Sequence, residues 1–331
     1  MILQHKRYMN IIEYFKLHFL ALLIIFVFLT GCTECDYCIG NRLYLKGEFT
    51  QSAKHFKKAA IQENAKAQFN LAFMYTEGKG VAKNNKKAAY WYLKASEQGD
   101  IKATYNLGVL YAKGRGVEKD ANKAKKYFKI AADANDCKAQ YNLAYLYYDG
   151  EGIEQDYRKA YKWFLKAAKQ SNAGAQYYLG IIYYFGEGVK QDYRKAYEWF
   201  LKSAKQSDAY SQYALGEIYS EGKGVAQDYV KAEYWFALSF KNGNWDAGNI
   251  LAYQWAEQGI KLNEAEIMIK KVIDKFPDDG NFIDTLGWIY YKQRKYHQAI
   301  TQLERAAKLQ ADDATIKKHL DDAYSKVGKV K

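Results

Sequence analysis

The chain has 331 residues, among them 50 Lys and Arg, 37 Asp and Glu, four Cys and one Pro. Apolar residues make up 49% of it and charged residues 26%, a balance that provides apolar surface to bury and excludes disorder throughout the chain. A single Pro argues against a sheet-rich fold with Pro-bearing turns and favours a helical one. Four Cys are too few to predict a small fold held together by disulfides.

The first segment has the pattern of a targeting signal. A basic start precedes the unbroken apolar run Phe19–Leu29. This run is too short to cross a bilayer but has the usual length of the apolar middle of a secretory signal. We expect a signal peptide over residues 1–31, and whether translation starts at Met1 or at Met9 stays open.

The residues Leu29, Thr30, Gly31 and Cys32 end this run and resemble the lipobox of bacterial lipoproteins. The resemblance implies cleavage before Cys32 and a diacylglycerol on its thiol, with small residues at Thr30 and Gly31 fitting the peptidase. Several acyl chains would then hold the chain on a membrane of the bacterial cell envelope through its first residue. Thr33, in place of Asp, fits sorting to the outer membrane, facing either the periplasm or the surface. An uncleaved anchor and an ordinary secretory signal are the alternatives.

The body of the chain repeats with a constant period. The string Ala67-Gln68-Phe69-Asn70-Leu71-Ala72 recurs every 36 residues. The copies start at Ala67, Ala103, Ala139, Ala175 and Ser211, and a degenerate sixth starts at Ala247. Such a period indicates a solenoid in which each unit packs only on its neighbours. We therefore predict five repeats, over 67–102, 103–138, 139–174, 175–210 and 211–246.

Each repeat has the pattern of a helix, a loop and a second helix. In the first helix Ala67, Leu71 and Tyr75 recur four residues apart and form one apolar face. A Gly-x-Gly pair then ends that helix, because glycine adopts the left-handed conformation without a Cβ penalty. The second helix combines an Ala with an aromatic residue three positions later, as in Ala160 and Trp163, which is expected to fill the gap between repeats. The side chains expected to cap the second helices are Asn84, Asp120, Asp156, Asp192 and Asp228.

This pattern resembles the Sel1-like repeat family. The shared string is Ala-Gln-x-x-Leu-Gly-x-x-Tyr, a Gly-x-Gly-Val loop, an Asp, and Lys-Ala-x-x-Trp-x-x-x-Ala, which residues 139–210 match almost throughout. Repeat two departs from it with Tyr127 in place of the Trp. The resemblance implies an all-α fold, an α/α superhelical solenoid of helical hairpins. It also implies adaptor roles in assembling envelope complexes and, in some pathogens, contact with host cells and virulence.

Both ends of the array resemble tetratricopeptide repeats instead. Leu286 and Ala299 are 13 residues apart, where the Sel1-like unit has 17, so the extra loop is missing here. We expect hybrid and tetratricopeptide-like repeats over 247–313 and a C-terminal capping helix over 314–331. At the front, residues 32–66 resemble a degenerate tetratricopeptide repeat.

No residue set in the sequence points to catalysis, a cofactor or a metal. His55, His297 and His319 lie among charged residues and are expected on solvated helix faces. Cys35 and Cys38 form a Cys-x-x-Cys pair, with no second pair to complete a zinc site. In an oxidising envelope, these two Cys residues form a local or an intermolecular disulfide in one interpretation and stay inert thiols in the other.

The excess of Lys and Arg is spread through every repeat beside Asp and Glu, which is typical of a solvated outer face. Weak attraction to anionic envelope polymers or lipid phosphates is the alternative interpretation. Nucleic acid is not expected as a partner of an exported protein.

The concave face of the superhelix is the surface most suited to a partner. In each first helix, the positions two before, two after and five after the Leu are neighbours on the helix surface and are expected on this face. Tyr is frequent there and offers a large contact area with little rotamer entropy to lose. The predicted binding residues are Phe69, Tyr105, Tyr141, Tyr145, Tyr148, Tyr177, Tyr184 and Tyr213. The alternative is that the Tyr two before the Leu belongs to the core.

Together these patterns predict a lipid-anchored, non-enzymatic scaffold of the bacterial envelope that binds partner proteins or peptide segments in its groove. An envelope enzyme or a peptidoglycan-binding factor, of the kind that hydrolyses cell wall or β-lactams, is the alternative. It would require a set of cleft residues that the sequence does not display. A third interpretation, a purely structural spacer, needs no discrete partner.

Overall fold

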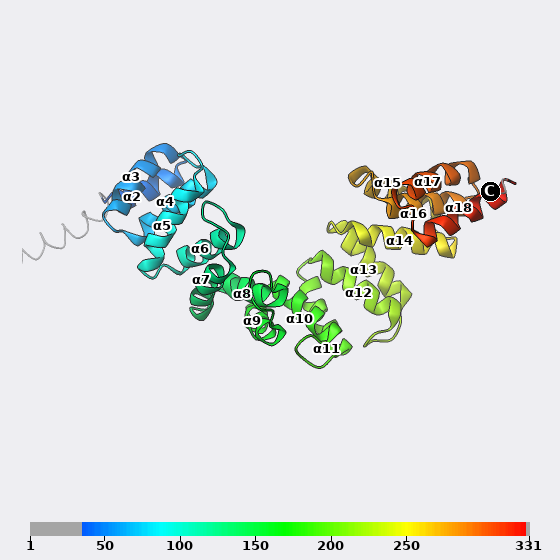
Figure 1. The fold of residues 1–331 in the computed structure, drawn as a ribbon, viewed down its shortest axis with the longest axis horizontal. Coiled ribbons are helices and arrows are strands. Elements are labelled where there is room, and N and C mark those ends of the chain that lie inside the picture. The colour runs from blue at the N-terminus through cyan, green and yellow to red at the C-terminus, as the bar shows by residue number, and fades with distance from the viewer. Residues whose placement is uncertain (1–34, 329–331) are drawn as a thin grey trace, which may run out of the picture. The chain divides into compact units, whose positions relative to one another are not determined.

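The computed structural model describes residues 35–328 of the chain. These residues form seventeen helices, α2 to α18, and no strand, which confirms the predicted all-α fold (Figure 1). The predicted signal peptide over 1–31 and the lipobox with Cys32 lie outside the described residues. The helices group into two compact units, one ending at Asp156 and one beginning at Tyr157.

The N-terminal unit is a series of helices in which each packs on the next along the chain. The helices are α2 (Asp36–Leu45), α3 (Phe49–Ile61), α4 (Ala65–Glu77), α5 (Asn85–Glu97), α6 (Ile101–Lys113), α7 (Ala121–Asp133) and α8 (Cys137–Asp149). The hairpin of α2 and α3 lies within residues 32–66, where a degenerate tetratricopeptide repeat is expected. The hairpins α4–α5 and α6–α7 correspond to the first two 36-residue repeats.

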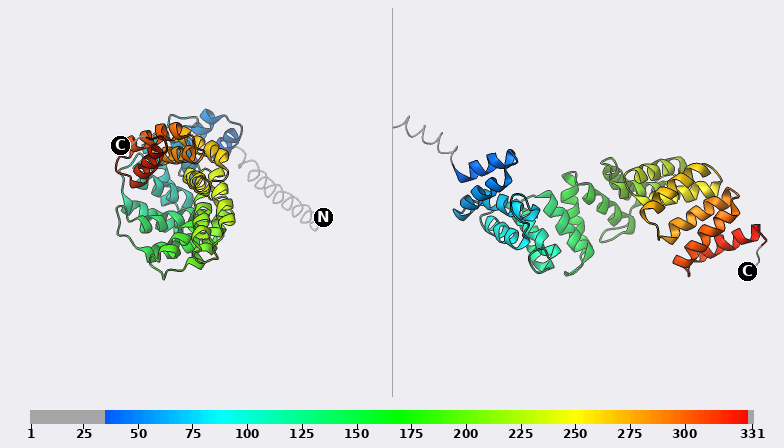
Figure 2. Two further views of the ribbon diagram at one scale, coloured as in Figure 1. Left: turned by 90° about the vertical axis from the view of Figure 1, so that its right-hand side faces the viewer. Right: turned by 90° about the horizontal axis from the view of Figure 1, so that it is seen from above.

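The C-terminal unit continues the same pattern, with successive helices packed side by side (Figure 2). Its helices are α9 (Tyr157–Lys169), α10 (Ala173–Phe185), α11 (Tyr193–Ala204), α12 (Ala209–Glu221), α13 (Tyr229–Lys241), α14 (Trp245–Gln258), α15 (Leu262–Lys275), α16 (Gly280–Lys292), α17 (Tyr296–Leu309) and α18 (Ala314–Lys326). The helix α16 also contacts α14 and α18 directly. We call the even-numbered helices first helices and the odd-numbered helices second helices.

The core of each hairpin lies where its two helices meet. The Ala and Leu of the first helix, such as Ala175 and Leu179, are fully buried, and so is the Ala of the second helix, such as Ala196. The aromatic residue three after that Ala is only half-buried, and the core ring belongs to the next residue instead. Four positions return a helical side chain to within about 40° of its starting direction, whereas three leave it about 60° away. The core rings are Tyr92, Phe128, Phe164, Phe200 and Phe236.

The half-buried Trp has the bridging role that the sequence predicted. Trp91 packs against the core of α3 and α4 and also against the core of α5 and α6. Trp235 likewise contacts two successive cores. The outer face of such a ring takes a cation, since Lys166 Nζ lies 3.9 Å from the ring centroid of Trp163.

The Gly-x-Gly loops meet two separate requirements. The first Gly ends the first helix in the left-handed conformation, as predicted; these residues are Gly78, Gly114, Gly150, Gly186 and Gly222. The second Gly also has positive φ and lies against the second helix of the preceding repeat. A Cβ on Gly80 would lie 2.2 Å from the carbonyl carbon of Phe49, and one on Gly116 would lie 2.2 Å from that of Asn85. The loop is therefore a contact between repeats as well as a helix end.

Polar side chains satisfy the backbone at the helix ends. Four of the predicted caps each accept the backbone N–H three residues later, namely Asn84, Asp120, Asp192 and Asp228. First helices are capped in the same way, as where Asp208 accepts the N–H of Ser211. The buried Gln of the repeat string ties hairpins together, because Gln212 Nε2 donates to the carbonyl oxygen of Ala204 on the preceding helix at 3.1 Å. Within residues 35–328 no helix has the length and apolarity needed to cross a membrane.

Candidate functional site

Three of the pockets in the described part of the chain open on first-helix faces. The smallest of the three, the α2/α4 pocket, has a volume of about 330 Å³. Its lining is Asn41, Tyr44, Leu45, Phe69, Asn70 and Phe73. Phe69 and Phe73 hold the positions two before and two after the buried Leu71, where the sequence placed the binding face.

The α6/α8 pocket, of about 430 Å³, repeats this arrangement two hairpins further along the N-terminal unit. Its lining is Tyr105, Val109, Ala112, Lys113, Lys119, Ala121, Phe128, Tyr141, Asn142, Tyr145, Leu146, Asp149 and Glu151. From α6 come all three of the predicted positions, and from α8 come the positions two before and two after the Leu. The Tyr141 and Tyr145 rings are stacked with centroids 6.5 Å apart, and Asn142 Nδ2 donates to Tyr105 Oη at 3.1 Å.

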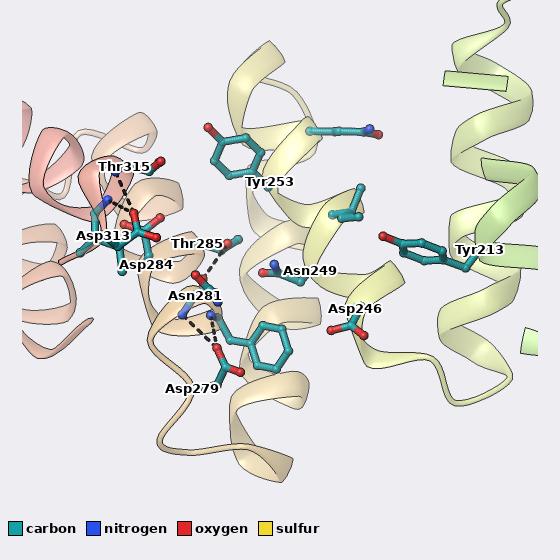
Figure 3. A pocket seen from close by; sticks show the side chains of 14 residues that line it. Tyr213, Asp246, Asn249, Tyr253, Asp279, Asn281, Asp284, Thr285, Asp313 and Thr315 are labelled. Atoms are coloured by element: carbon teal, nitrogen blue, oxygen red, sulfur yellow. Dashed lines mark hydrogen bonds between the residues drawn. The ribbon is translucent and has the colours of Figure 1, made fainter. Parts of the chain in front are cut away.

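The α14 groove, of about 620 Å³, lies in the C-terminal unit with walls from α12, α14, α16 and α18 (Figure 3). Its lining is Tyr213, Asp246, Asn249, Ile250, Tyr253, Gln254, Asp279, Asn281, Phe282, Asp284, Thr285, Asp313, Thr315 and Ile316. Because α14, α16 and α18 are all first helices, this groove also belongs to the first-helix face.

The structure distributes the eight predicted binding residues over these pockets unevenly. Phe69 lines the α2/α4 pocket, and Tyr213 lines the α14 groove. Tyr105, Tyr141 and Tyr145 come together in the α6/α8 pocket. The remaining three, Tyr148, Tyr177 and Tyr184, line none of the three pockets. The binding role of all eight stays a prediction.

The residues two before the Leu also pack on the core, in line with the alternative interpretation. The ring centroid of Tyr105 lies 5.9 Å from that of Phe128, and the ring centroid of Tyr213 lies 5.7 Å from that of Phe236. Burial raises the pKa of Tyr105 above the ordinary value of a phenol. Tyr145, two after the Leu, is 38% exposed and is therefore the better candidate for direct contact with a partner.

Tyr177 and Tyr184 have neighbours of different kinds. The Tyr177 ring lies 5.9 Å from that of Phe200 and 6.1 Å from that of Tyr210, in an aromatic cluster. The Tyr184 hydroxyl accepts a hydrogen bond from Lys223 Nζ at 2.9 Å. Lys223 also pairs with Glu221, and these bonds raise the pKa of its ammonium group.

A buried histidine that the sequence analysis placed wrongly contacts Asp284, one of the residues that line the α14 groove. His319 is 3% exposed, and its Nδ1 lies 2.9 Å from Asp284 Oδ2. Its ring stacks on Trp288 with centroids 4.0 Å apart. Although charged residues surround His319 in the sequence, it lies three residues after the buried Ile316 and therefore on the inward face of α18. The prediction of a solvated face is wrong for this residue. His297 is exposed, and the half-buried His55 pairs with Asp36 at 2.7 Å.

The Cys-x-x-Cys pair lies at the beginning of α2. Cys35 is the N-cap, and its Sγ accepts the backbone N–H of Cys38 at 3.1 Å. A disulfide between the two stays a prediction. Within residues 35–328 no group of three or more His, Cys, Asp or Glu side chains could hold a metal ion.

Sequence reasoning missed the acidic and amide residues of the α14 groove. The signal was available, because Asn249 and Asp284 stand two before Leu251 and Leu286, the same position that the Tyr residues hold in the Sel1-like repeats. The predicted binding face covers only the five regular repeats. Applied to the hybrid and tetratricopeptide-like hairpins, the same rule of positions predicts a polar continuation of the aromatic face.

Comparison with known proteins agrees with this architecture. The model of the Sel1 repeat matches residues 65–100, 101–136, 137–172, 173–208 and 209–244, more than half of the chain. Each matched repeat begins two residues before the corresponding start predicted from the sequence and coincides with the beginning of a first helix. A comparison with curated proteins found no match.

Two solved structures illustrate the likeness. One is c5321, a protective antigen present in uropathogenic Escherichia coli strains that displays an SLR fold. It is 30% identical with a TM-score of 0.80, over 89% of this chain and 65% of that one. The other is a Sel1 repeat protein from Oxalobacter formigenes, 35% identical with a TM-score of 0.62, over 66% of this chain and 90% of that one. The chain thus spans about two thirds of the length of the Escherichia coli protein.

Repeat solenoids of this type are generally non-catalytic scaffolds, and their extended faces suit them to binding other proteins or peptides. The five matched repeats, the helical hairpins and the two solved structures lead to one assignment: the chain belongs to the Sel1 repeat family.

Proposed function

We propose that this protein is a non-enzymatic scaffold that holds segments of partner proteins on its first-helix faces. The observation that carries the proposal is the lining of the α6/α8 pocket, to which α6 and α8 contribute the same repeat positions. A surface with one set of positions repeated from hairpin to hairpin suits an extended ligand, which also repeats along its length. The aromatic rings there supply contact area at little cost in rotamer entropy.

We propose further that the scaffold is lipid-anchored in the bacterial cell envelope, at the outer membrane. The support is the lipobox Leu29 to Cys32 with the apolar run before it. At such a place its partners are envelope proteins or, for a surface-facing chain, molecules of a host. The description of the Escherichia coli relative as a protective antigen favours the second setting and a part in virulence.

Partner capture by paired variants tests the binding role. Tyr145→Ala with Tyr148→Ala changes the first-helix face of α8 in the N-terminal unit. Tyr90→Ala with Ile130→Ala is the matched control, since these side chains are 53% and 45% exposed on second helices of the same unit. We expect the first pair to lose the proteins that co-purify with the wild type after crosslinking in cells, and the control pair to keep them. Equal capture by both pairs, at unchanged melting temperatures, would contradict the proposal.

A further inference from the structure

We infer that the α14 groove binds an extended partner segment that carries Arg or Lys beside apolar residues. The inference rests on the proposed scaffold function and specifies the chemistry of one of its ligands. The groove has the size for it, because ligand pockets commonly measure about 300–1,000 Å³ and this one about 620 Å³. Its walls belong to the first helices of three successive hairpins and to the last helix α18, so that a segment lying across them meets these helices only (Figure 3).

The charge of the groove is opposite to that of the chain. The whole chain has 50 Lys and Arg against 37 Asp and Glu. The fourteen residues that line the groove include four Asp and neither Lys nor Arg. Attraction by net charge would recruit acidic partners, whereas this groove selects basic ones.

Three carboxylates of the groove, those of Asp246, Asp279 and Asp313, have no ion pair within the described residues, whereas Asp284 pairs with His319. At the second helices, cap Asp residues pair with a Lys three positions later, as Asp120 does with Lys123 at 3.3 Å. In the groove, the residues three positions after the caps Asp279 and Asp313 are the apolar Phe282 and Ile316. Each of these two caps uses only Oδ1 for the backbone N–H groups, and no ion pair within residues 35–328 engages its Oδ2.

Two further acceptors lie along α14. Asp246 is exposed at its first turn, and no ion pair within the described residues neutralises it. Asn249 comes one turn later, and its Oδ1 is buried with no hydrogen-bond partner. Figure 3 shows Asp246, Asn249 and Tyr253 one after another along this helix. A buried acceptor without a donor costs free energy, which a donor on a ligand would recover.

The apolar part of the lining fits the stem of a basic side chain. Tyr213 and Tyr253 flank the acceptors, and Ile250, Phe282 and Ile316 add aliphatic and aromatic surface. Lys and Arg cover apolar surface with their methylene stems while the charged head reaches an acceptor. Arg also stacks on aromatic faces, and both side chains only donate hydrogen bonds, as this set of acceptors requires.

Selection from random short peptides displayed on phage tests the inference with the full-length chain. The comparison variant carries Asp246→Asn, Asp279→Asn and Asp313→Asn together. Asn caps helices about as well as Asp, so this variant keeps its fold while it loses three charges. We expect peptides retained by the wild type to be enriched in Arg and Lys, and the best of them to bind the variant about tenfold more weakly. Asp120→Asn, a cap outside the groove, is the control and should leave the affinity unchanged.

Several outcomes would overturn the inference: enrichment of acidic or neutral peptides, no retained peptides at all, or equal affinity for wild type and triple variant. A second variant adds a test that does not depend on loss of binding. Asp246→Lys should reject the selected basic peptide and accept its counterpart in which Glu replaces Arg. If the Asp variants of the groove do not change peptide affinity as expected, while the Tyr145 and Tyr148 double variant still loses its partners, only the cationic ligand is refuted. If both fail, the scaffold function is refuted as well.

Discussion

The two glycines of one loop should differ in what an added methyl group costs, because only one of them touches the preceding repeat. Gly78 and Gly80 both have positive φ, so Ala at either site incurs the left-handed penalty of about 1–2 kcal/mol. A Cβ on Gly78 meets nothing closer than Lys83 Cβ at 3.4 Å. A Cβ on Gly80 would lie 2.2 Å from backbone of Phe49, which must move away. Such overpacking adds about 1–3 kcal/mol.

We therefore expect Gly78→Ala to lower the free energy of unfolding by about 1–2 kcal/mol and Gly80→Ala by about 2–5 kcal/mol. Urea denaturation followed by far-UV circular dichroism measures both values. The variants differ by two positions in a single loop, so the comparison isolates the contact between repeats. Equal losses in the two variants would refute the reasoning that the second glycine is required by stacking.

Four further substitutions in the C-terminal unit test the core, the polar tie between hairpins and a buried carboxyl. Phe200→Ala should cost about 3–5 kcal/mol in unfolding free energy and Trp199→Ala less, because only the Phe is fully buried. Gln176→Ala removes a donor to the carbonyl of Ala168 and leaves the Gln206 amide unpaired, which should cost about 1–3 kcal/mol. Burial raises the pKa of Glu217, so protonation stabilises the fold and the ionised form destabilises it. Glu217→Gln should raise the melting temperature by up to about 3 °C near pH 7, with the gain shrinking as the pH falls toward about 4.

Each of these has a clear contrary result. A greater loss of unfolding free energy from Trp199→Ala than from Phe200→Ala would mean that Trp199, which the sequence pattern named, is the core residue. An unchanged unfolding free energy in Gln176→Ala would show that the polar tie contributes nothing. A gain from Glu217→Gln that is the same at both pH values would mean that the carboxyl is not penalised by burial.

The repetition in the sequence predicts the helices because each signal occurs five times. The first glycine of the loop, the cap and the Ala and Leu face recur at fixed spacing, and the structure places them as expected. The repeated pattern did not show that the second glycine has a different role from the first, because this role is a contact with the backbone of another repeat. The sequence pattern named only the aromatic residue three after the Ala, as at Trp199, and the packed hairpin shows that Phe200 is the fully buried ring.

The candidate site was predicted in part. The rule of three positions led to Tyr105, Tyr141 and Tyr145, which share one pocket. It did not find the carboxylates of Asp279 and Asp313 in the α14 groove, because a Lys far away in the sequence can also reach an Asp, and only the folded chain shows that none does within the described residues. His319 shows the same limit, since its burial depends on Asp284, 35 residues away.

Site-specific photo-crosslinking tests the central claim, that first-helix faces hold the partner, most directly. A photoreactive residue replaces Tyr145 or Tyr253 on first helices, and Tyr90 or Tyr234 on second helices, where they are 53% and 59% exposed. We expect discrete adducts from Tyr145 and Tyr253 in living cells and none from Tyr90 and Tyr234. Adducts confined to the two second-helix sites, or spread evenly over all four, would contradict it.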